Sequence, residues 1–447
     1  MKNKLILLFS FIFTFATYAQ ETTQNFSLQE AIDFALENNR ATKNAARDIE
    51  AAEKQKWETT ASGLPQLDAN IDYQNWLKQQ VSLLPGEIAG GDPGTFVAVP
   101  FGTKQTMNAT ATLSQLLFDG SYLVGLQSAK VYLEISEFAK EKTDLEVRKA
   151  VINAYGNVLL AEETLDILNK NIEVIKNNLH ETTKIYENGL TEEENVEQLE
   201  ITLSNLESAY NNMSRMEVIA LQMLNITLGI DLNTNTILTE NLEVLTLQKM
   251  SLDLLNADDN VENTIDFKIA ENDKTSKELL LKLEKSKYLP TLNAFVNGGY
   301  NGNHDEFNFV NSNQKWFGSS LLGVSMKIPI FSSGMRSAAT QRAKINLEKA
   351  TDDLTETEQQ IKLEIASAKS DYQFAIEEYE NKKQNLNLAE RIERKNQTKF
   401  FEGISSSFDL RQAQTQLYTA QEEYLQTMLN VINAKTNLET ILNTITD

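Results

Sequence analysis

The chain has 447 residues, of which 41% are hydrophobic and 23% charged, with a formal net charge of −22. An ordinary apolar fraction excludes a chain that is disordered by composition, and an acidic balance excludes a basic nucleic-acid binder. Because there is no cysteine, disulfides, thiolate chemistry and lipid modification of an N-terminal cysteine are excluded as well.

Residues 1–19 have the pattern of a secretory signal peptide. Lys2 and Lys4 precede an apolar run from Leu5 to Phe15, and small residues follow it. This run is short for a membrane helix, and no later segment reaches the roughly 18 to 20 apolar residues that a span requires. We therefore expect an exported protein, in which any membrane crossing uses strands.

The remaining chain is divided by its prolines, all of which lie in two windows near residues 65–100 and 290–329. Since proline interrupts helices, the proline-free tracts predict long helices and the two windows predict strands and turns. A first repeat, residues 20–229, is expected to contain a helix from Ser27 to about Ser62, strands at 66–76 and 105–118, and helices at 121–187 and 191–228. A connecting region at 230–262 precedes a second repeat at 263–447, with a helix at 264–288, strands at 291–300 and 319–330, and helices at 334–401 and 405–443.

The two repeats match at a nearly constant offset. Gly120 and Gly334 are 214 residues apart, and so are Gly189 and Gly403. Upstream, the Leu-Pro pairs ending at Pro65 and Pro290 are 225 residues apart. The first repeat therefore has about eleven extra residues between its strands, in a glycine-rich stretch that we interpret as a loop insertion.

The helices and strands have different kinds of apolar face. Helices after Gly189 and Gly403 have apolar spacings of three and four, which are typical of a coiled-coil seam and by themselves indicate packing only. Each strand has one apolar and one polar face. Helices of about 67 residues, or about 100 Å, are too long simply to cover strands of about 33 Å.

A strand of 9 to 11 residues with one apolar and one wet face suits an outer-membrane barrel. Four strands cannot close around a channel, and lipid does not tolerate open edges. Three chains of four strands give about twelve, an even number within the usual range. The pattern therefore favours a mainly α chain with a transmembrane β-barrel portion that is shared between copies.

The ordered motifs resemble those of the TolC-type outer-membrane efflux proteins. They are the opening SLQEAIDFALENN, the helix-to-strand turns LPQL and LPTL, the strand-to-helix turns LFDG and IFSSG, and the glycine turns YENGLT and FFEGIS. No single motif is specific, but all of them occur in order, twice, behind a signal peptide.

The resemblance implies a homotrimer with a twelve-stranded barrel in the outer membrane and a periplasmic α-barrel of long antiparallel coiled-coil helices. It also implies a passive exit duct for a tripartite efflux or type I secretion system, with a periplasmic adaptor (membrane fusion protein) and an inner-membrane transporter as partners. The barrel would contact outer-membrane lipid.

The resemblance also implies site residues. The glycine turns would be periplasmic tips, where the adaptor docks and the duct narrows; they comprise Gly189, Leu190, Gly403, Ile404 and Ser405. Acidic residues beyond the second tip form a gate ring in family members, and Asp409 occupies the first such position. Gln412 stands three residues on, and Asn195 is at the matching place in the first repeat. The alternative is that Asp409 is a solvated acid favoured by the helix dipole. The strand–helix junctions would lie at Pro65, Gly120, Pro290 and Gly334.

No catalytic or cofactor constellation is present in the sequence. His180 and His304 have no paired-carboxylate or metal-ligand spacing around them, so we expect no enzyme and no metal site. Two other functions stay open: an exported coiled-coil scaffold and a periplasmic adaptor-like protein, neither of which forms a membrane channel.

Overall fold

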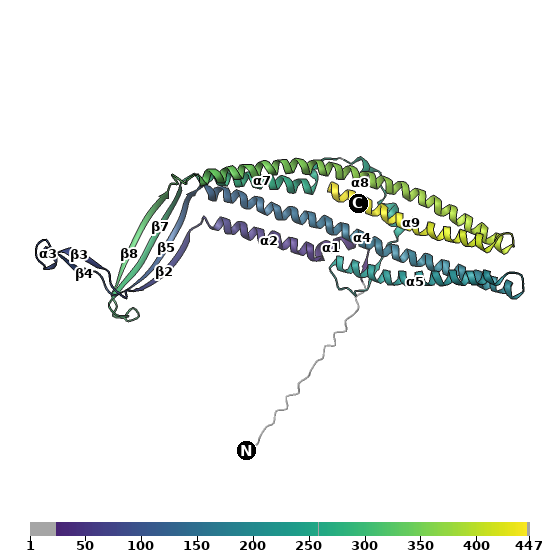
Figure 1. Cartoon of the computed structure of the whole chain (residues 1–447), viewed down its shortest axis with the longest axis horizontal. Coiled ribbons are helices and arrows are strands. Elements are labelled where there is room, and N and C mark those ends of the chain that lie inside the picture. The colour runs from purple at the N-terminus through teal and green to yellow at the C-terminus, as the bar shows by residue number, and fades with distance from the viewer. Residues whose placement is uncertain (1–23, 258, 445–447) are drawn as a thin grey trace, which may run out of the picture. The chain divides into compact units, whose positions relative to one another are not determined.

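The computed structural model describes residues 24–257 and 259–444, and they are mostly helical (Figure 1). The predicted signal peptide lies outside the described residues. The helices are α1 (Leu28–Asn38), α2 (Arg40–Ala61), α3 (Gly86–Ala89), α4 (Gly120–Glu187), α5 (Glu193–Leu228), α6 (Leu242–Lys249), α7 (Ile265–Ser286), α8 (Met335–Phe401) and α9 (Ser407–Leu442), with short 3-10 turns at Asp253–Asn256 and Val261–Asn263.

The strands form three separate sheets. They are β1 (Gln24–Phe26), β2 (Gln66–Asn75), β3 (Val81–Pro85), β4 (Phe96–Pro100), β5 (Gln105–Asp119), β6 (Thr236–Leu238), β7 (Thr291–His304) and β8 (Trp316–Lys327). The largest sheet has the order β2-β5-β7-β8, and β1 pairs with β6 and β3 with β4. The four predicted strands are thus the four members of one sheet.

The chain divides into two compact units, each of which takes segments from both halves of the sequence. Unit 1 comprises Met1–Arg47, Ala139–Lys268 and Glu358–Asp447, and unit 2 comprises Asp48–Phe138 and Ile269–Thr357. The division follows packing rather than chain order, so it cuts across the predicted repeats.

Unit 1 has a helical core that gathers α1, β6 and α6 against parts of α4, α5, α8 and α9. Its largest fully buried side chains include Tyr155, Tyr372 and Tyr379. The Tyr155 hydroxyl donates to the Phe26 carbonyl (3.1 Å), which satisfies a polar group that burial would otherwise leave costly.

The predicted first helix is divided into α1 and α2. Its start agrees with the sequence, because Ser27 and Glu30 form the expected capping box. The prediction of an unbroken helix to Ser62 is wrong. Asn39 leaves the helical conformation (ψ 140°), and its side chain accepts from Ala41 N (2.7 Å) and donates to the Thr227 carbonyl (2.7 Å). This tertiary contact has no periodic signal in the sequence.

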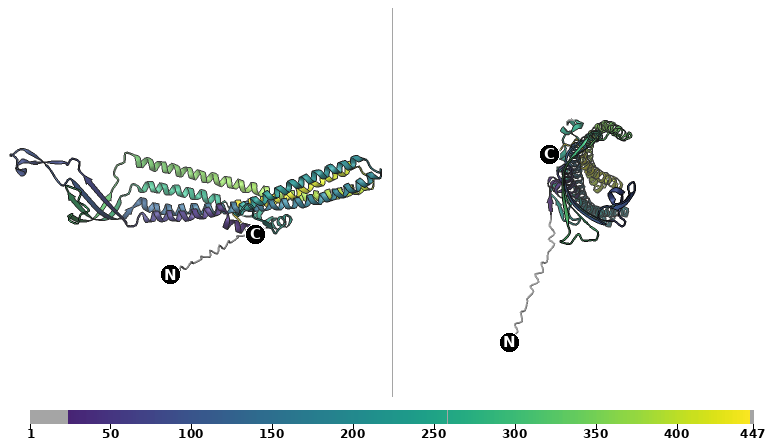
Figure 2. Two further views of the ribbon diagram at one scale, coloured as in Figure 1. Left: turned by 90° about the horizontal axis from the view of Figure 1, so that it is seen from below. Right: turned by 90° about the vertical axis from the view of Figure 1, so that its left-hand side faces the viewer.

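Unit 2 is built around the antiparallel four-stranded sheet, whose strands lie side by side in Figures 1 and 2. The pairing carries one row across the sheet from Asp68 through Thr112 and Asn297 to Leu321. A bulge between Leu116 and Phe118 ends the regular alternation of β5. On the apolar face of the edge strands, Leu67 is 72% and Leu322 73% exposed.

The bounds of two strands differ from those predicted by more than one residue. β7 continues to His304, four residues past the expected end, because Gln105 of β5 pairs with it. β8 runs over Trp316–Lys327 rather than 319–330, and Pro329, which has no N–H to donate, follows its end. The glycine-rich insertion is not simply a loop, since β3 and β4 form a hairpin there.

Among residues 24–257 and 259–444, no helix is both long enough and apolar enough to cross a membrane.

Candidate functional site

Both predicted tip turns lie in unit 1 and have the same backbone geometry. At the end of α4, Gly189 N donates to Tyr186 O (2.8 Å) and Leu190 N to Ile185 O (3.1 Å). At the end of α8, the corresponding bonds are Gly403 N to Phe400 O (3.0 Å) and Ile404 N to Lys399 O (2.8 Å). Each pair defines a Schellman motif, in which the glycine adopts a left-handed conformation. The glycines have φ of 74° and 73°.

A shared hollow joins the two tips. Its volume is about 620 Å³, and its lining takes Leu190 and Asn195 from the first tip and Gly403 and Ser405 from the second. Phe400 and Phe401, with ring centroids 5.5 Å apart, also line it. The structure therefore brings together predicted residues from turns that are 214 positions apart in the chain. Of the other predicted tip and gate residues, Gly189, Ile404, Asp409 and Gln412 are not in this lining.

The tips expose apolar side chains at matching places. Leu190 is 78% and Ile404 71% exposed, and each directly follows its glycine. A large apolar side chain at the end of a hairpin gains nothing from the core of its own unit.

Asp409 is part of a capping box at the start of α9. Its Oδ2 accepts from Ser406 Oγ (2.6 Å), Ser406 N (3.1 Å) and Ser405 Oγ (3.2 Å), and its own N–H donates to Ser406 Oγ (3.2 Å). These bonds, foremost the one from the Ser406 hydroxyl, lower the pKa of the Asp409 carboxyl below its usual range. In the single chain, Asp409 is thus a charged capping residue of α9.

The corresponding residues of the first tip are arranged differently. Glu192 precedes α5 without a side-chain capping bond. Asn195, three residues on, donates from Nδ2 to Thr191 Oγ1 (2.8 Å). Gln412, in the first turns of α9, is exposed.

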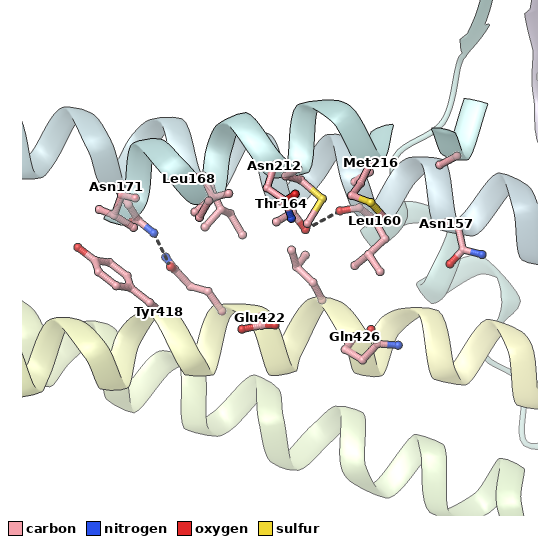
Figure 3. A pocket seen from close by; sticks show the side chains of 18 of the residues that line it. Asn157, Leu160, Thr164, Leu168, Asn171, Asn212, Met216, Tyr418, Glu422 and Gln426 are labelled. Carbon is pink, nitrogen blue, oxygen red and sulfur yellow. Dashed lines mark hydrogen bonds between the residues drawn. The ribbon is translucent and has the colours of Figure 1, made fainter. Parts of the chain in front are cut away.

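A long groove lies farther from the tips, between α4, α5 and α9. Its volume is about 650 Å³. Figure 3 shows Leu160, Leu168 and Met216 on one side and Tyr418 on the other, with Asn171 donating to Gln421 Oε1 (2.9 Å) across it. Burial raises the pKa of Tyr418, and Glu393 adds to the rise, so the phenol stays neutral. The heptad pattern predicts an apolar surface on these helices. Which apolar side chains line the groove, rather than pack against a neighbouring helix, depends on how the helices pair.

The strand–helix junctions lie in unit 2. In each one, the side chain two residues after the glycine donates a hydrogen bond to a backbone carbonyl and so stabilises the turn. After Gly120, the Tyr122 hydroxyl donates to Thr60 O (3.0 Å). After Gly334, Arg336 donates from Nη1 to Pro329 O (3.0 Å) and stacks over Tyr288 at 5.0 Å. Pro65 and Pro290 directly precede β2 and β7.

The two junction glycines differ from each other. Gly334 has φ of 82°, whereas Gly120 opens α4, where a Cβ would approach Leu289 Cδ1 to 2.7 Å. Sequence reasoning missed Arg336, whose only signal was its position two residues after a predicted junction glycine.

The described part of the chain holds no group of three or more His, Cys, Asp or Glu that could bind a metal ion. Of the two histidines, His304 uses Nδ1 locally with the backbone N–H of Glu306 (3.0 Å).

The chain is similar to known proteins over nearly all of its described residues. The family model for outer membrane efflux proteins matches residues 31–229 and 261–444. A comparison with curated protein sequences finds no match.

Solved outer-membrane channels have a similar fold. A structure of CusC matches with a TM-score of 0.75 and 17% identity, covering 93% of this chain and 91% of that one. VceC of Vibrio cholerae matches with 0.71 and 14%, covering 93% and 96%, and CmeC of Campylobacter jejuni with 0.70 and 19%, covering 93% and 85%. The fold and the family are those of channel proteins.

Proposed function

This chain belongs to the outer membrane efflux protein family, and we propose that three copies of it form one exit duct. It is an outer membrane efflux channel with a large periplasmic helical portion. The observation that carries the trimer is the sheet of unit 2, because its edge strands β2 and β8 have no partner strand among the described residues.

Copies of this chain are the natural partners for those edges. A strand edge in lipid must be paired, since no water is there to satisfy its N–H and C=O groups. Pairing β2 of one copy with β8 of the next closes a ring of about twelve strands from three chains. The exposed Leu67 and Leu322 then face lipid, and the row from Asp68 to Asn297 faces the lumen.

The trimer is tested by cross-linking its strand edges. The chain has no cysteine, so Ala69→Cys and Ser320→Cys can be introduced together as a unique pair. Both lie in one row across the sheet, through Ala111 and Gly298, and on opposite edges. We expect a covalent trimer on a denaturing gel after thiol-reactive linkers are added to outer membranes. Only monomer, or recovery of the protein in the soluble periplasm, would support the scaffold instead.

The tips are proposed to dock a periplasmic adaptor that connects the duct to an inner-membrane transporter. Leu190 and Ile404 support this, because each places an exposed apolar side chain at the end of a helical hairpin. Leu190→Ser with Ile404→Ser should reduce adaptor recovery in a pull-down from detergent extracts. Leu252→Ser, at a 62% exposed leucine outside the tips, is the matched control. Equal recovery of the adaptor with the unchanged chain, the double tip variant and the Leu252→Ser control would show that the tips are not part of the docking surface.

The gate is proposed to include Asp409, with Gln412 and Asn195 at neighbouring or matching places. Three carboxylates around a threefold axis would favour cations in the lumen. Because Asp409 also caps α9, its charge and its capping role must be separated. Asp409→Asn removes the charge, whereas Ser406→Ala removes the hydroxyl that binds it and keeps the charge.

Single-channel recording in planar bilayers distinguishes the two roles. We expect Asp409→Asn to reduce cation selectivity and Ser406→Ala to keep it. If both variants change selectivity equally, the effect belongs to the helix start and Asp409 has no role of its own in the gate.

A further inference from the structure

The β3–β4 hairpin lies beyond the end of the four-stranded sheet in unit 2 (Figures 1 and 2). It follows β2 and precedes β5, so it leaves the sheet at the end opposite the strand–helix junctions. This is where the first half of the sequence has its extra residues. Five residue pairs, from Val81 with Pro100 to Pro85 with Phe96, make its ladder.

The strands of the hairpin carry no charged side chain. Their ten residues are apolar except for Ser82, and the two charged residues between them, Glu87 and Asp92, lie in the turn region. On one face, Val81 is 52%, Leu83 65% and Phe96 69% exposed. The opposite face holds half-buried residues, namely Leu84, Val97 and Val99.

A hairpin of this kind is not stable by itself in water. An isolated two-stranded ribbon is marginal even with a good turn, and uncharged apolar strands without a cover promote association. Soluble edges are normally protected by charges, which these strands lack. The exposed face therefore needs a partner.

Acyl chains are excluded as that partner by what lies at the base of the hairpin. An aromatic cluster stands there, in which Tyr73 contacts Phe307 and Phe309 with ring centroids 5.7 and 5.9 Å apart, and Phe309 lies 6.3 Å from Trp316. Aromatic rings at the ends of barrel strands mark the membrane–water interface. Charged residues occupy the same level, with Lys104 N donating to Asp305 Oδ1 (3.1 Å). The hairpin continues beyond this level and so leaves the hydrocarbon.

We propose that the β3–β4 hairpins of three copies pack against one another at the outer mouth of the duct. In a ring, each copy meets its two neighbours through two different surfaces. The hairpin has two such surfaces, the exposed face with Leu83 and the opposite face with Leu84 and Val99. A second copy is always available there, because the free β2 and β8 edges bring copies side by side. This inference rests on the proposed trimer.

The test uses one cysteine on each face of the hairpin. Leu83 and Val99 stand on opposite faces, so the pair Leu83→Cys and Val99→Cys cannot join within one chain, where the two Cβ atoms point apart. Oxidation of the cysteines to disulfides on whole cells, with an added oxidant that takes up the two thiol protons and two electrons, should convert most of the protein to a covalent trimer. Each single-cysteine variant can give dimer at most.

The edge pair Ala69→Cys with Ser320→Cys separates this inference from the trimer itself. If the edge pair gives a trimer and the hairpin pair gives monomer, the hairpins do not pack together although the duct is trimeric. The same conclusion follows if the hairpin cysteines join a different surface protein or stay free to react with a thiol-blocking reagent. If neither pair gives a trimer, the proposed assembly fails as a whole.

Discussion

At the two tips, the helices that end there, α4 and α8, have the same C-terminal geometry. The helices that begin there, α5 and α9, have different N-terminal caps. Both α4 and α8 end in Schellman motifs around a left-handed glycine. After the second tip, Ser406 and Asp409 form a complete capping box, whereas after the first tip Glu192 makes no side-chain capping bond. In the single chain, therefore, α9 has a start fixed by side chains and α5 has one that depends on its backbone and on the helix dipole.

This difference indicates which tip is easier to open. An uncapped helix leaves its first N–H groups to water, so its first turn frays at lower cost than a capped one. Glu193 and Glu194 favour the α5 start through the dipole, but that term is screened at an exposed site. We expect the first turn of α5 to be the more mobile of the two.

The largest effect is expected at the tip glycines themselves. In both Gly189→Ala and Gly403→Ala, a Cβ would meet nothing within 4 Å, so the cost is that of the left-handed backbone alone, about 1 kcal/mol. Hydrogen exchange of the tip amides should accelerate by about fivefold in each variant.

Gly125→Ala is the control, because Gly125 lies inside α4 with only ordinary contact to Thr59. There, alanine should stabilise the helix. Unequal responses of the two tips to the same substitution would contradict their shared geometry.

A comparable effect, confined to one tip, is the loss of the cap. Ser406→Ala removes the hydroxyl that accepts from Asp409 N (3.2 Å), and N-cap losses of this kind cost about 1 kcal/mol. Exchange should accelerate in the first turn of α9 to the level seen in α5. Glu192→Ala, at the matching place, should leave α5 unchanged. If both alanine variants have the same effect, the difference in capping does not control fraying.

The sequence could predict where the tips lie but not how they are capped. Gly189 and Gly403 stand where two helical periods meet, and the constant offset makes them equivalent. The run Ser405, Ser406 and Ser407 offers three candidate capping residues, and only the folded chain shows that the second accepts from Asp409. A pattern of residue types does not contain that geometry.

The same limit applies in other parts of the chain. The break at Asn39 depends on Thr227, which is 188 residues away. The start of β8 was misplaced because Phe317 and Leu321 occupy positions on its polar side and blur the alternation. The sequence does not predict the β3–β4 hairpin. The glycines in its turn are typical of a loop, and they hide the two short apolar strands on either side.

A smaller effect is expected when the missing cap is added to the first tip. In Glu192→Ser, a hydroxyl stands one position before α5, three residues from Asn195, as Ser406 stands before Asp409. The serine hydroxyl would accept a hydrogen bond from the backbone N–H of Asn195, which should stabilise the first turn by about 0.5 kcal/mol. This is the low end for a cap, because Asn195 has no carboxylate to accept the second bond of a capping box. Slower exchange at residues 193–196, with no change in α9, is the expected outcome. Faster exchange would mean that Glu192 stabilises the helix start in another way.

The smallest effect is the response of the two tips to acid. The pKa of Asp409 is lowered by its bonds from Ser406, so its contribution is complete above the pKa of an unfolded aspartate, about 3.9, and is lost as the pH falls through the lower folded value. The amide of Asn195 has no such proton to gain. Protection factors in the first turn of α9 should therefore fall relative to those of α5 as the pH is lowered below the unfolded value of about 3.9. In Ser406→Ala, which lacks the main cause of the lowered pKa, this fall should be smaller and should end at a higher pH, because the folded pKa lies closer to the unfolded one. A fall of unchanged size and range would show that the capping bond does not set the charge of Asp409.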